Sequence, residues 1–97
     1  MPKLLEELKA KHDEIYAIAE KYGVSNIRVF GSVARGEEKK NSDVDFLVKG
    51  KKGTSLFEIV RFKREVEKLI RKKADVILDD SVNKLLKKII FNEAISI

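Results

Sequence analysis

The sequence contains no cysteine and no tryptophan, and it has one histidine and one proline among its 97 residues. Without cysteine the chain can form neither a disulfide framework nor a thiolate nucleophile or metal ligand. Its one histidine, His12, falls on a predicted helix, where we expect it to face solvent rather than to act as a base. The chemistry of the chain must therefore rest on other side chains.

Long apolar runs are also absent. No run approaches the roughly 20 residues that a helix needs to span a bilayer. The segment Met1–Glu7 is amphipathic and acidic, unlike the uninterrupted apolar core of a signal peptide. We therefore expect a cytoplasmic protein that has no membrane partner.

The composition that remains is 43% hydrophobic and 38% charged, a profile of an ordered globular chain. At this length we expect a single domain over residues 1–97. The formal net charge of +5 favours polyanionic partners, although acidic residues are interspersed along most of the chain. The densest basic stretch, residues 61–73, falls on a predicted helix, so a contact with nucleic acid or with an acidic protein stays open there.

The spacing of apolar residues predicts three amphipathic helices. They cover about residues 3–22, residues 55 to 71–73, and a last segment that begins near residues 81–83 and contains Leu85 to Ala94. Gly23 ends the first helix, and Thr54 or Ser55 is expected to cap the second, with Glu58 near the position of a capping box. Exposed apolar positions on the terminal helices predict a partner protein or a dimer.

Short β-branched and aromatic runs predict three strands, over residues 27–30, 44–48 and 74–78. A polar connection with a short turn or helix covers residues 31–42, and residues 49–53 form a loop by composition. The order of elements is therefore α-β-(short turn or helix)-β-α-β-α. This order predicts an α/β (α+β) fold in which helices cover a small sheet.

Three aspartates occur in the predicted strands, where this residue is disfavoured and costly to bury. Asp43 and Asp45 begin the strand 44–48, and Asp75 lies in the strand 74–78. Residues two apart on a strand share a face, about 6 to 7 Å apart, so Asp43 and Asp45 should converge. Converging carboxylates suit Mg²⁺, and three of them could hold two ions if the strands are neighbours.

Each aspartate also has a structural interpretation. The run Asn41-Ser42-Asp43 has the chemistry of a turn, and an aspartate at a strand edge is often a turn or cap residue. We interpret Asp79 and Asp80, which follow a strand and precede a helix, as turn and helix-dipole residues. The coincidence of three acids in apolar strands favours the metal site.

A glycine–serine turn precedes these acids. Gly31 permits close approach of a ligand, and Ser32 can cap a short helix whose exposed amides bind phosphate. Arg35 could add a charge-assisted contact, or could be structural or face solvent. The turn is neither a Walker A loop, because Glu37-Glu38 replace the required lysine and serine, nor a dinucleotide fingerprint, because the third glycine is absent.

Gly31-Ser32, ten residues and Asp43-Val44-Asp45 follow one another within residues 29–48. This string closely resembles the minimal nucleotidyltransferases of the DNA polymerase β-like superfamily. The resemblance extends over nearly the whole chain, through the start of a helix at Leu56 and the strand that carries Asp75. Residues 89–95 also resemble the last helix of that family.

The resemblance implies a palm with a mixed sheet that transfers AMP from ATP to an acceptor hydroxyl. Ser32 and the amides of the turn would hold the triphosphate, Asp43 and Asp45 would bind two Mg²⁺ ions, and Asp75 would complete the site and help to activate the acceptor. Members of this size often serve as antitoxins for a helical, HEPN-type toxin, and some transfer AMP to a tyrosine of that toxin. The cofactor is thus expected to be Mg²⁺, with ATP as substrate.

Two other functions remain open from the sequence. The chain could be a binding module that masks a toxin without catalysis, although the presence of all three acids argues against complete decay. It could also be a nucleic-acid-binding regulator that uses the basic helix, although no helix-turn-helix pattern supports this.

Overall fold

A computed structural model describes residues 3–97. Its centre is a four-stranded mixed sheet of strand order β3-β2-β1-β4. The strands are β1 (Val24–Phe30), β2 (Val44–Gly50), β3 (Ala74–Leu78) and β4 (Ile95–Ser96). β1 runs antiparallel to both β2 and β4, whereas β2 and β3 are parallel. The mixed sheet that the resemblance implied is confirmed.

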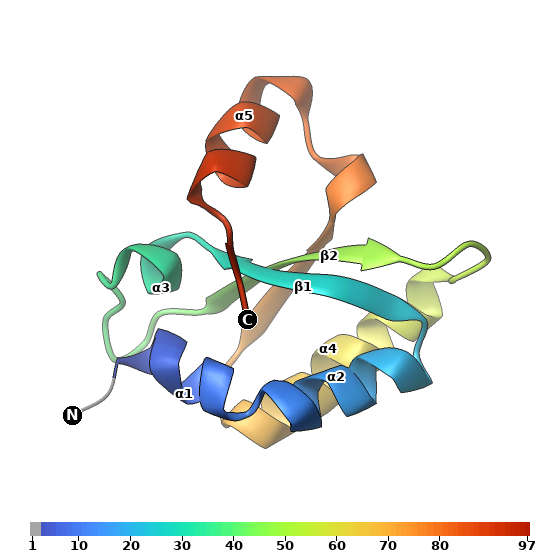
Figure 1. Cartoon of the computed structure of the whole chain (residues 1–97), viewed down its shortest axis with the longest axis horizontal. Coiled ribbons are helices and arrows are strands. Elements are labelled where there is room, and N and C mark those ends of the chain that lie inside the picture. The colour runs from blue at the N-terminus through green and yellow to red at the C-terminus, as the bar shows by residue number, and fades with distance from the viewer. Residues whose placement is uncertain (1–2) are drawn as a thin grey trace.

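Helices cover the two faces of this sheet unequally (Figure 1). α1, α2 and α4 lie against one face, whereas α5 stands over the other. The helices are α1 (Leu4–Ala10), α2 (His12–Lys21), α3 (Ser32–Arg35), α4 (Leu56–Ile70) and α5 (Lys84–Glu93), with a 3-10 turn at Asp79–Ser81. None of the helices within residues 3–97 has the length and apolar character that a membrane crossing requires.

The alternation of side chains along β2 separates the core from the candidate site. Val44, Phe46 and Val48 are fully buried, and they pack in one cluster with Ile15 of α2 and Phe62 of α4. Because successive strand residues point to opposite faces, Asp45 projects from the other face. The apolar residues of the strand therefore fix the sheet on its helices and turn its acidic residue toward the open side.

The first helix differs from the expectation. The segment 3–22 is divided at Lys11, whose φ of −96° and ψ of 14° lie outside the helical range and bend the chain between α1 and α2. Buried Leu8 and Ile15 lie on either side of the bend. The apolar spacing continues across it and so did not reveal it.

The beginning of α4 agrees with the expectation. Ser55 is the N-cap, and its hydroxyl oxygen accepts the amide proton of Glu58 at 3.4 Å. The Glu58 side chain bonds Arg61 rather than returning to the cap, so the capping box is only half formed. β3 matches the predicted strand 74–78.

The first strand is longer than predicted, because it begins at Val24 rather than residue 27. Its pairing with β2 is irregular between Ser25 and Arg28, and Asn26 has a φ of 48°. A bulge of this kind breaks the alternation of apolar and polar residues by which a strand is recognised. The polar pair Ser25-Asn26 therefore lay outside the predicted strand.

The last helix begins where the sequence predicted, but it ends before Ala94. Asn83 caps it, accepting the amide proton of Leu85 at 2.9 Å, and the helix ends at Glu93. Ile95 and Ser96 then form β4 against β1, instead of continuing the helix as the family resemblance suggested. The chain thus returns to the sheet immediately after α5.

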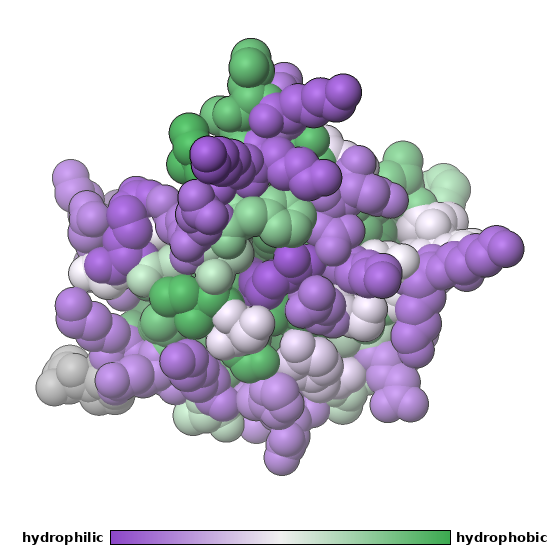
Figure 2. Space-filling view, turned by 45° about the horizontal axis from the view of Figure 1, so that its top comes forward, coloured by the Kyte–Doolittle hydropathy of each residue, from purple (hydrophilic) through white to green (hydrophobic). Residues whose placement is uncertain are grey.

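α5 exposes an apolar surface. The helix has no buried residue, and Leu85, Leu86 and Ile89 are 85%, 52% and 61% exposed. Figure 2 shows apolar surface beside hydrophilic surface at the top of the molecule, where α5 stands in Figure 1. Large apolar groups in this number are unusual on a solvated helix and are typical of a contact surface.

Candidate active site

Asp45 and Asp75 lie side by side on adjacent strands. Their Cα atoms are partners in the parallel register of β2 and β3, and neighbouring strands are about 4.8 Å apart. Both side chains project from the face opposite the helical core. Asp45 is half-buried and Asp75 is exposed. The condition set by the sequence, that these strands be neighbours, is therefore met.

The surroundings of Asp45 disfavour its ionised form. Burial raises the pKa of the Asp45 carboxyl, and the negative charges of Asp75, Asp43 and Glu93 raise it further, while Arg35 acts in the opposite direction. Like charges raise a pKa only when they are close. The carboxylates thus form a cluster of mutual repulsion that a bound cation would relieve.

Gly31 touches this cluster from the end of β1. Phe30 is the register partner of Asp45, so Gly31 follows at the same edge. Gly31 has a φ of 75°, and a β-carbon built there would lie 2.3 Å from Oδ2 of Asp45. Only glycine fits, both because of this contact and because of its backbone conformation. The glycine–serine turn and the acidic strand therefore meet at these two residues.

The turn continues into α3, a single helical turn. Ser32 begins α3 and is half-buried, and buried Val33 anchors it in the core. Gly36 ends the helix in the left-handed conformation, with a φ of 71°. The segment predicted as a short turn or helix is thus a short helix, and it holds Ser32 at the edge of the sheet.

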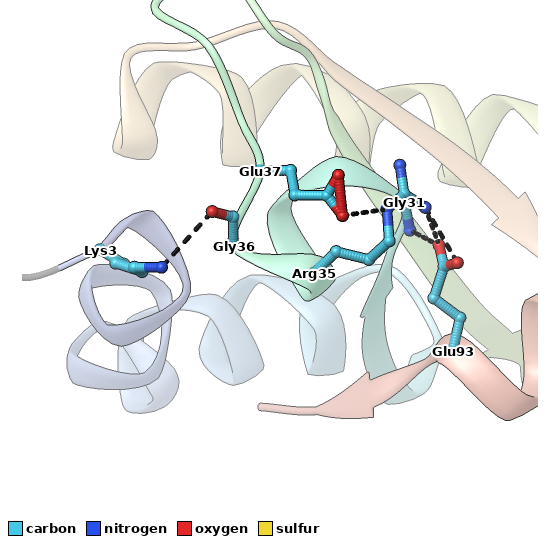
Figure 3. Close-up of polar contacts among 6 residues, drawn as sticks. All are labelled: Lys3, Gly31, Arg35, Gly36, Glu37 and Glu93. Atoms are coloured by element: carbon cyan, nitrogen blue, oxygen red, sulfur yellow. Dashed lines mark hydrogen bonds and ion pairs between the residues drawn. The ribbon is translucent and has the colours of Figure 1, made fainter.

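Arg35 lies between two carboxylates (Figure 3). Its Nη1 donates to both carboxylate oxygens of Glu93 at 2.9 Å, and its Nε donates to Glu37 at 3.2 Å. The bonds and charge of Glu93 raise the pKa of the Arg35 guanidinium, so it stays charged. Glu93 also accepts the amide proton of Gly31.

Glu93 was not identified from the sequence. It falls in the predicted last helix, and the spacing of that helix gives no sign that its end contacts the turn some 60 residues earlier. Only the return of the chain through β4 brings Glu93 to Gly31 and Arg35. No local pattern in the sequence indicates these contacts of Glu93, because they depend on the tertiary fold.

Two hollows adjoin the carboxylates. One, of about 590 Å³, has Asp45 and Asp75 in its wall together with apolar side chains that include Leu56 and Val60 of α4. Asp43 instead lines a second, basic hollow of about 430 Å³; the cations there are Lys40, Arg71, Lys72 and Lys73. Asp43 precedes β2. It thus lines a different hollow from the one that Asp45 and Asp75 share.

Within residues 3–97, no three His, Asp or Glu side chains are grouped closely enough to form a ready-made metal site. The structure brings together Gly31, Asp45 and Asp75, with Arg35 joined to the same turn through Glu93. The arrangement combines a glycine-containing turn, the guanidinium of Arg35 and acidic oxygens at one edge of the sheet. Such a site suits a phosphate ester bound with a divalent cation.

Comparisons with known proteins show which family the chain resembles. The model of the nucleotidyltransferase domain family matches residues 1–97. MJ0435 of Methanocaldococcus jannaschii, which is named as a protein adenylyltransferase, is 42% identical over 93 residues, 96% of this chain and 97% of that protein. Protein adenylyltransferase MntA of Thermococcus cleftensis is 33% identical over 78 residues, 80% of this chain and 79% of its own length.

Solved structures show the same fold. A minimal nucleotidyltransferase structure matches with a TM-score of 0.85 and 33% identity, over 96% of this chain and 95% of the other. A toxin–antitoxin crystal structure with AMP-PNP matches with a TM-score of 0.73 at 16% identity, over 87% of this chain and 69% of the other. The chain belongs to the nucleotidyltransferase domain family and has the fold of its minimal members.

Proposed function

We propose that the chain transfers AMP from ATP to a hydroxyl group of a partner protein, and that it acts as the antitoxin of that partner. The observation that supports this most strongly is the contact between Gly31 and Asp45, with Asp75 beside Asp45 in register. A phosphate-binding turn and a pair of carboxylates at one edge are what transfer at phosphorus needs.

In this proposal the triphosphate binds at the end of β1. The Ser32 hydroxyl and the amides of the turn that follow Gly31 donate hydrogen bonds to phosphate oxygens, since the Gly31 amide itself donates to Glu93. Arg35 adds a charge-assisted bond from its guanidinium, which is permanently charged. These donors would fix the β- and γ-phosphates and leave the α-phosphorus over the strand edge at Asp45.

Asp43, Asp45 and Asp75 are the residues that would hold Mg²⁺, with two ions in the complete site. The donor set fits, because Mg²⁺ takes one or two protein carboxylates and fills its shell with water and substrate phosphates, so the free chain need not hold a closed cage. When bound, Mg²⁺ would neutralise charge on the attacking and leaving oxygens. The negative charges of Asp75 and Asp43, which add to burial in raising the pKa of Asp45, would be offset by such an ion.

The reaction is an in-line displacement. The acceptor oxygen forms a bond to the α-phosphorus, the bond from that phosphorus to the bridging oxygen breaks, and pyrophosphate leaves. The exposed Asp75 carboxylate takes the proton of the acceptor hydroxyl, since it lies at the open side of the pair. Rate acceleration then comes chiefly from positioning and from stabilising charge.

A protein acceptor is favoured by the relatives, since MJ0435 and MntA are both named for protein adenylyltransfer. The apolar surface of α5 (Leu85, Leu86, Ile89) agrees with a protein partner, because large exposed apolar groups favour protein contact over nucleic acid. We take that partner to be a helical, HEPN-type toxin.

The test is transfer of label. The chain is incubated with Mg²⁺, ATP labelled at the α-phosphate and the product of its neighbouring gene, and label should appear on that partner. Asp43→Asn and Asp45→Asn should abolish the transfer, whereas Asp13→Asn, a change at an exposed residue of α2, should not. Equal labelling by the double variant Asp43→Asn/Asp45→Asn would reject the catalytic assignment.

The second candidate is a binding module that neutralises a toxin by contact alone. The apolar surface of α5 favours it, because that surface needs no catalysis to bind a partner. The Asp43→Asn/Asp45→Asn variant separates the two functions. Full neutralisation of the toxin by this variant supports the binding module, whereas loss of neutralisation with retained complex formation supports the enzyme.

A further inference from the structure

Glu93 joins two parts of the candidate site. Its carboxylate accepts the amide proton of Gly31, and both of its oxygens accept from Nη1 of Arg35 at 2.9 Å (Figure 3). One side chain at the end of α5 thus contacts both the first residue of the glycine–serine turn and the arginine that follows it. No other residue within 3–97 forms side-chain hydrogen bonds with both of these groups.

The position of Glu93 is set by the backbone on both sides of it. On one side, the amide of Ala94 donates to the carbonyl of Ile90 at 2.9 Å, which closes α5. On the other side, Ile95 pairs with Val29 in β4 and β1, and Ile97 is buried. The backbone position of Glu93 is therefore fixed by α5 and β4, and it does not depend on the ion pair with Arg35.

Arg35 depends on its partners to a greater extent. Its side chain is half exposed, and its Nε bonds Glu37, whose side chain is 65% exposed. Exposed ion pairs of this kind contribute little to stability and constrain a long side chain weakly. Glu93 is only 21% exposed and accepts two bonds, so it is the main constraint on the guanidinium.

This arrangement orients the Arg35 guanidinium but does not use all of its hydrogen-bond donors. Within residues 3–97, Nη2 of the guanidinium has no hydrogen-bond partner, whereas Nη1 and Nε are both occupied. An arginine whose plane is fixed in advance loses less conformational freedom when it binds an anion. The free nitrogen is thus presented for a ligand while the occupied nitrogens hold its direction.

We propose that Glu93 is a positioning residue for nucleotidyl transfer, which fixes the backbone at Gly31 and holds the Arg35 guanidinium in the orientation that receives the triphosphate. The inference rests on the proposed function and adds to it a residue outside the glycine–serine and aspartate motifs. Glu93 touches no reacting atom and acts through Arg35. Its loss should therefore weaken the binding of ATP more than the chemical step.

The test compares two isosteric changes at the two carboxylates that hold Arg35. Glu93→Gln removes the charge but keeps an oxygen that can accept the Gly31 amide proton, and Glu37→Gln is the matched control. We expect Glu93→Gln to raise the KM and the Kd for ATP about tenfold, with kcat within about threefold of wild type. Glu37→Gln should change each constant by less than about twofold.

A double-mutant cycle shows whether Glu93 acts through Arg35. In an Arg35→Ala background, Glu93→Gln should add less than about twofold to the Kd for ATP, because the two residues then form one unit. A purely structural role for Glu93 would instead give the same penalty in both backgrounds, together with a lower Tm. That result would overturn the inference.

Two further results would overturn it. A Kd for ATP in Glu93→Gln equal to that in Glu37→Gln would remove Glu93 from the site, and a lower Kd than wild type would mean that its carboxylate competes with the triphosphate. If Glu93→Gln fails to fold, Glu93→Asp, which is shorter but keeps the charge, should raise the Kd for ATP above that of Glu37→Gln, and an equal Kd would overturn the inference. A wild-type chain that binds ATP but labels no partner rejects the proposed function alone, since the effects on Kd can still be measured.

Discussion

The Oδ2 atom of Asp45 occupies the space that a β-carbon at Gly31 would need. The separation would be 2.3 Å, closer than real β-carbons approach another heavy atom. The glycine is therefore required by the carboxylate as much as by its own φ of 75°. This contact ties the geometry of the turn to that of the acidic pair.

Gly31→Ala should damage the site by displacing Asp45. We expect transfer to fall about a hundredfold, because small misplacements of reacting groups have effects of this size, and stability to fall by about 1–3 kcal/mol from backbone strain. Gly53→Ala is the control. Gly53 has a φ of 88°, but an added β-carbon meets nothing within 4 Å. Gly53→Ala should therefore lose similar stability in urea denaturation but keep its activity in the labelling assay. Equal activity of the two variants would contradict the prediction.

Asp45→Asn should make the protein more stable at neutral pH while it abolishes transfer. The raised pKa of Asp45 means that the folded chain binds this proton more tightly than the unfolded chain does. The penalty for ionisation is absent below the ordinary aspartate pKa of about 3.9 and grows as pH rises through the higher folded-state value. Wild-type stability from this group therefore falls with rising pH across that window.

The measurement is the Tm of wild type and Asp45→Asn as a function of pH. The variant should melt at a higher temperature at pH 7, and the difference should shrink as the solution is made more acidic. Asp13→Asn, on the opposite side of the molecule from α5, should reproduce the wild-type pH dependence. A variant that melts below wild type at pH 7 would show that Asp45 stabilises the fold as an anion.

Mg²⁺ should stabilise the wild-type chain by relieving repulsion among the carboxylates. A ligand at ten times its Kd adds about 1.4 kcal/mol to the free energy of unfolding, and each kcal/mol raises the Tm of a domain of this size by about 4–8 °C. Asp45→Asn should lose this response, and a chelator should abolish both the response and transfer. Sodium chloride at matched ionic strength serves as control; equal shifts in the variant would place the ion elsewhere.

The sequence predicted the parts of the fold that local chemistry determines. Ser55 at the start of α4 and the strand Ala74–Leu78 were both predicted, because a helix cap and a short, mainly apolar run act over a few residues. The adjacency of β2 and β3 was stated as a condition and is confirmed. The catalytic and metal-binding roles of Asp43, Asp45 and Asp75 stay predictions.

The features that the sequence did not reveal depend on distant parts of the chain. β4 is two residues long and forms only because β1 offers a free edge beside it. Glu93 reaches Gly31 only after that pairing, so neither can be inferred from a local pattern. The bend at Lys11 is hidden for another reason, since the apolar period of the helix continues through it.

Asp75→Asn should separate chemistry from nucleotide binding. Asp75 lies on the far side of Asp45 from β1 and the glycine–serine turn, because β2 separates β3 from β1 in the sheet. Loss of a general base should lower kcat by about 10²–10⁴. The groups that would hold the triphosphate, Ser32 and Arg35, are untouched, so the Kd for ATP should change less than about threefold.

Single-turnover labelling and equilibrium titration with ATP measure the two effects separately. Asp80→Asn, an exposed aspartate in the turn after β3, is the matched control and should leave both constants unchanged. Full transfer by Asp75→Asn would remove this residue from the site. Loss of ATP binding would instead place Asp75 with the nucleotide, and the acceptor proton would then need another base. The chain's one histidine could not serve, because it lies on α2, which packs on the helical face of the sheet.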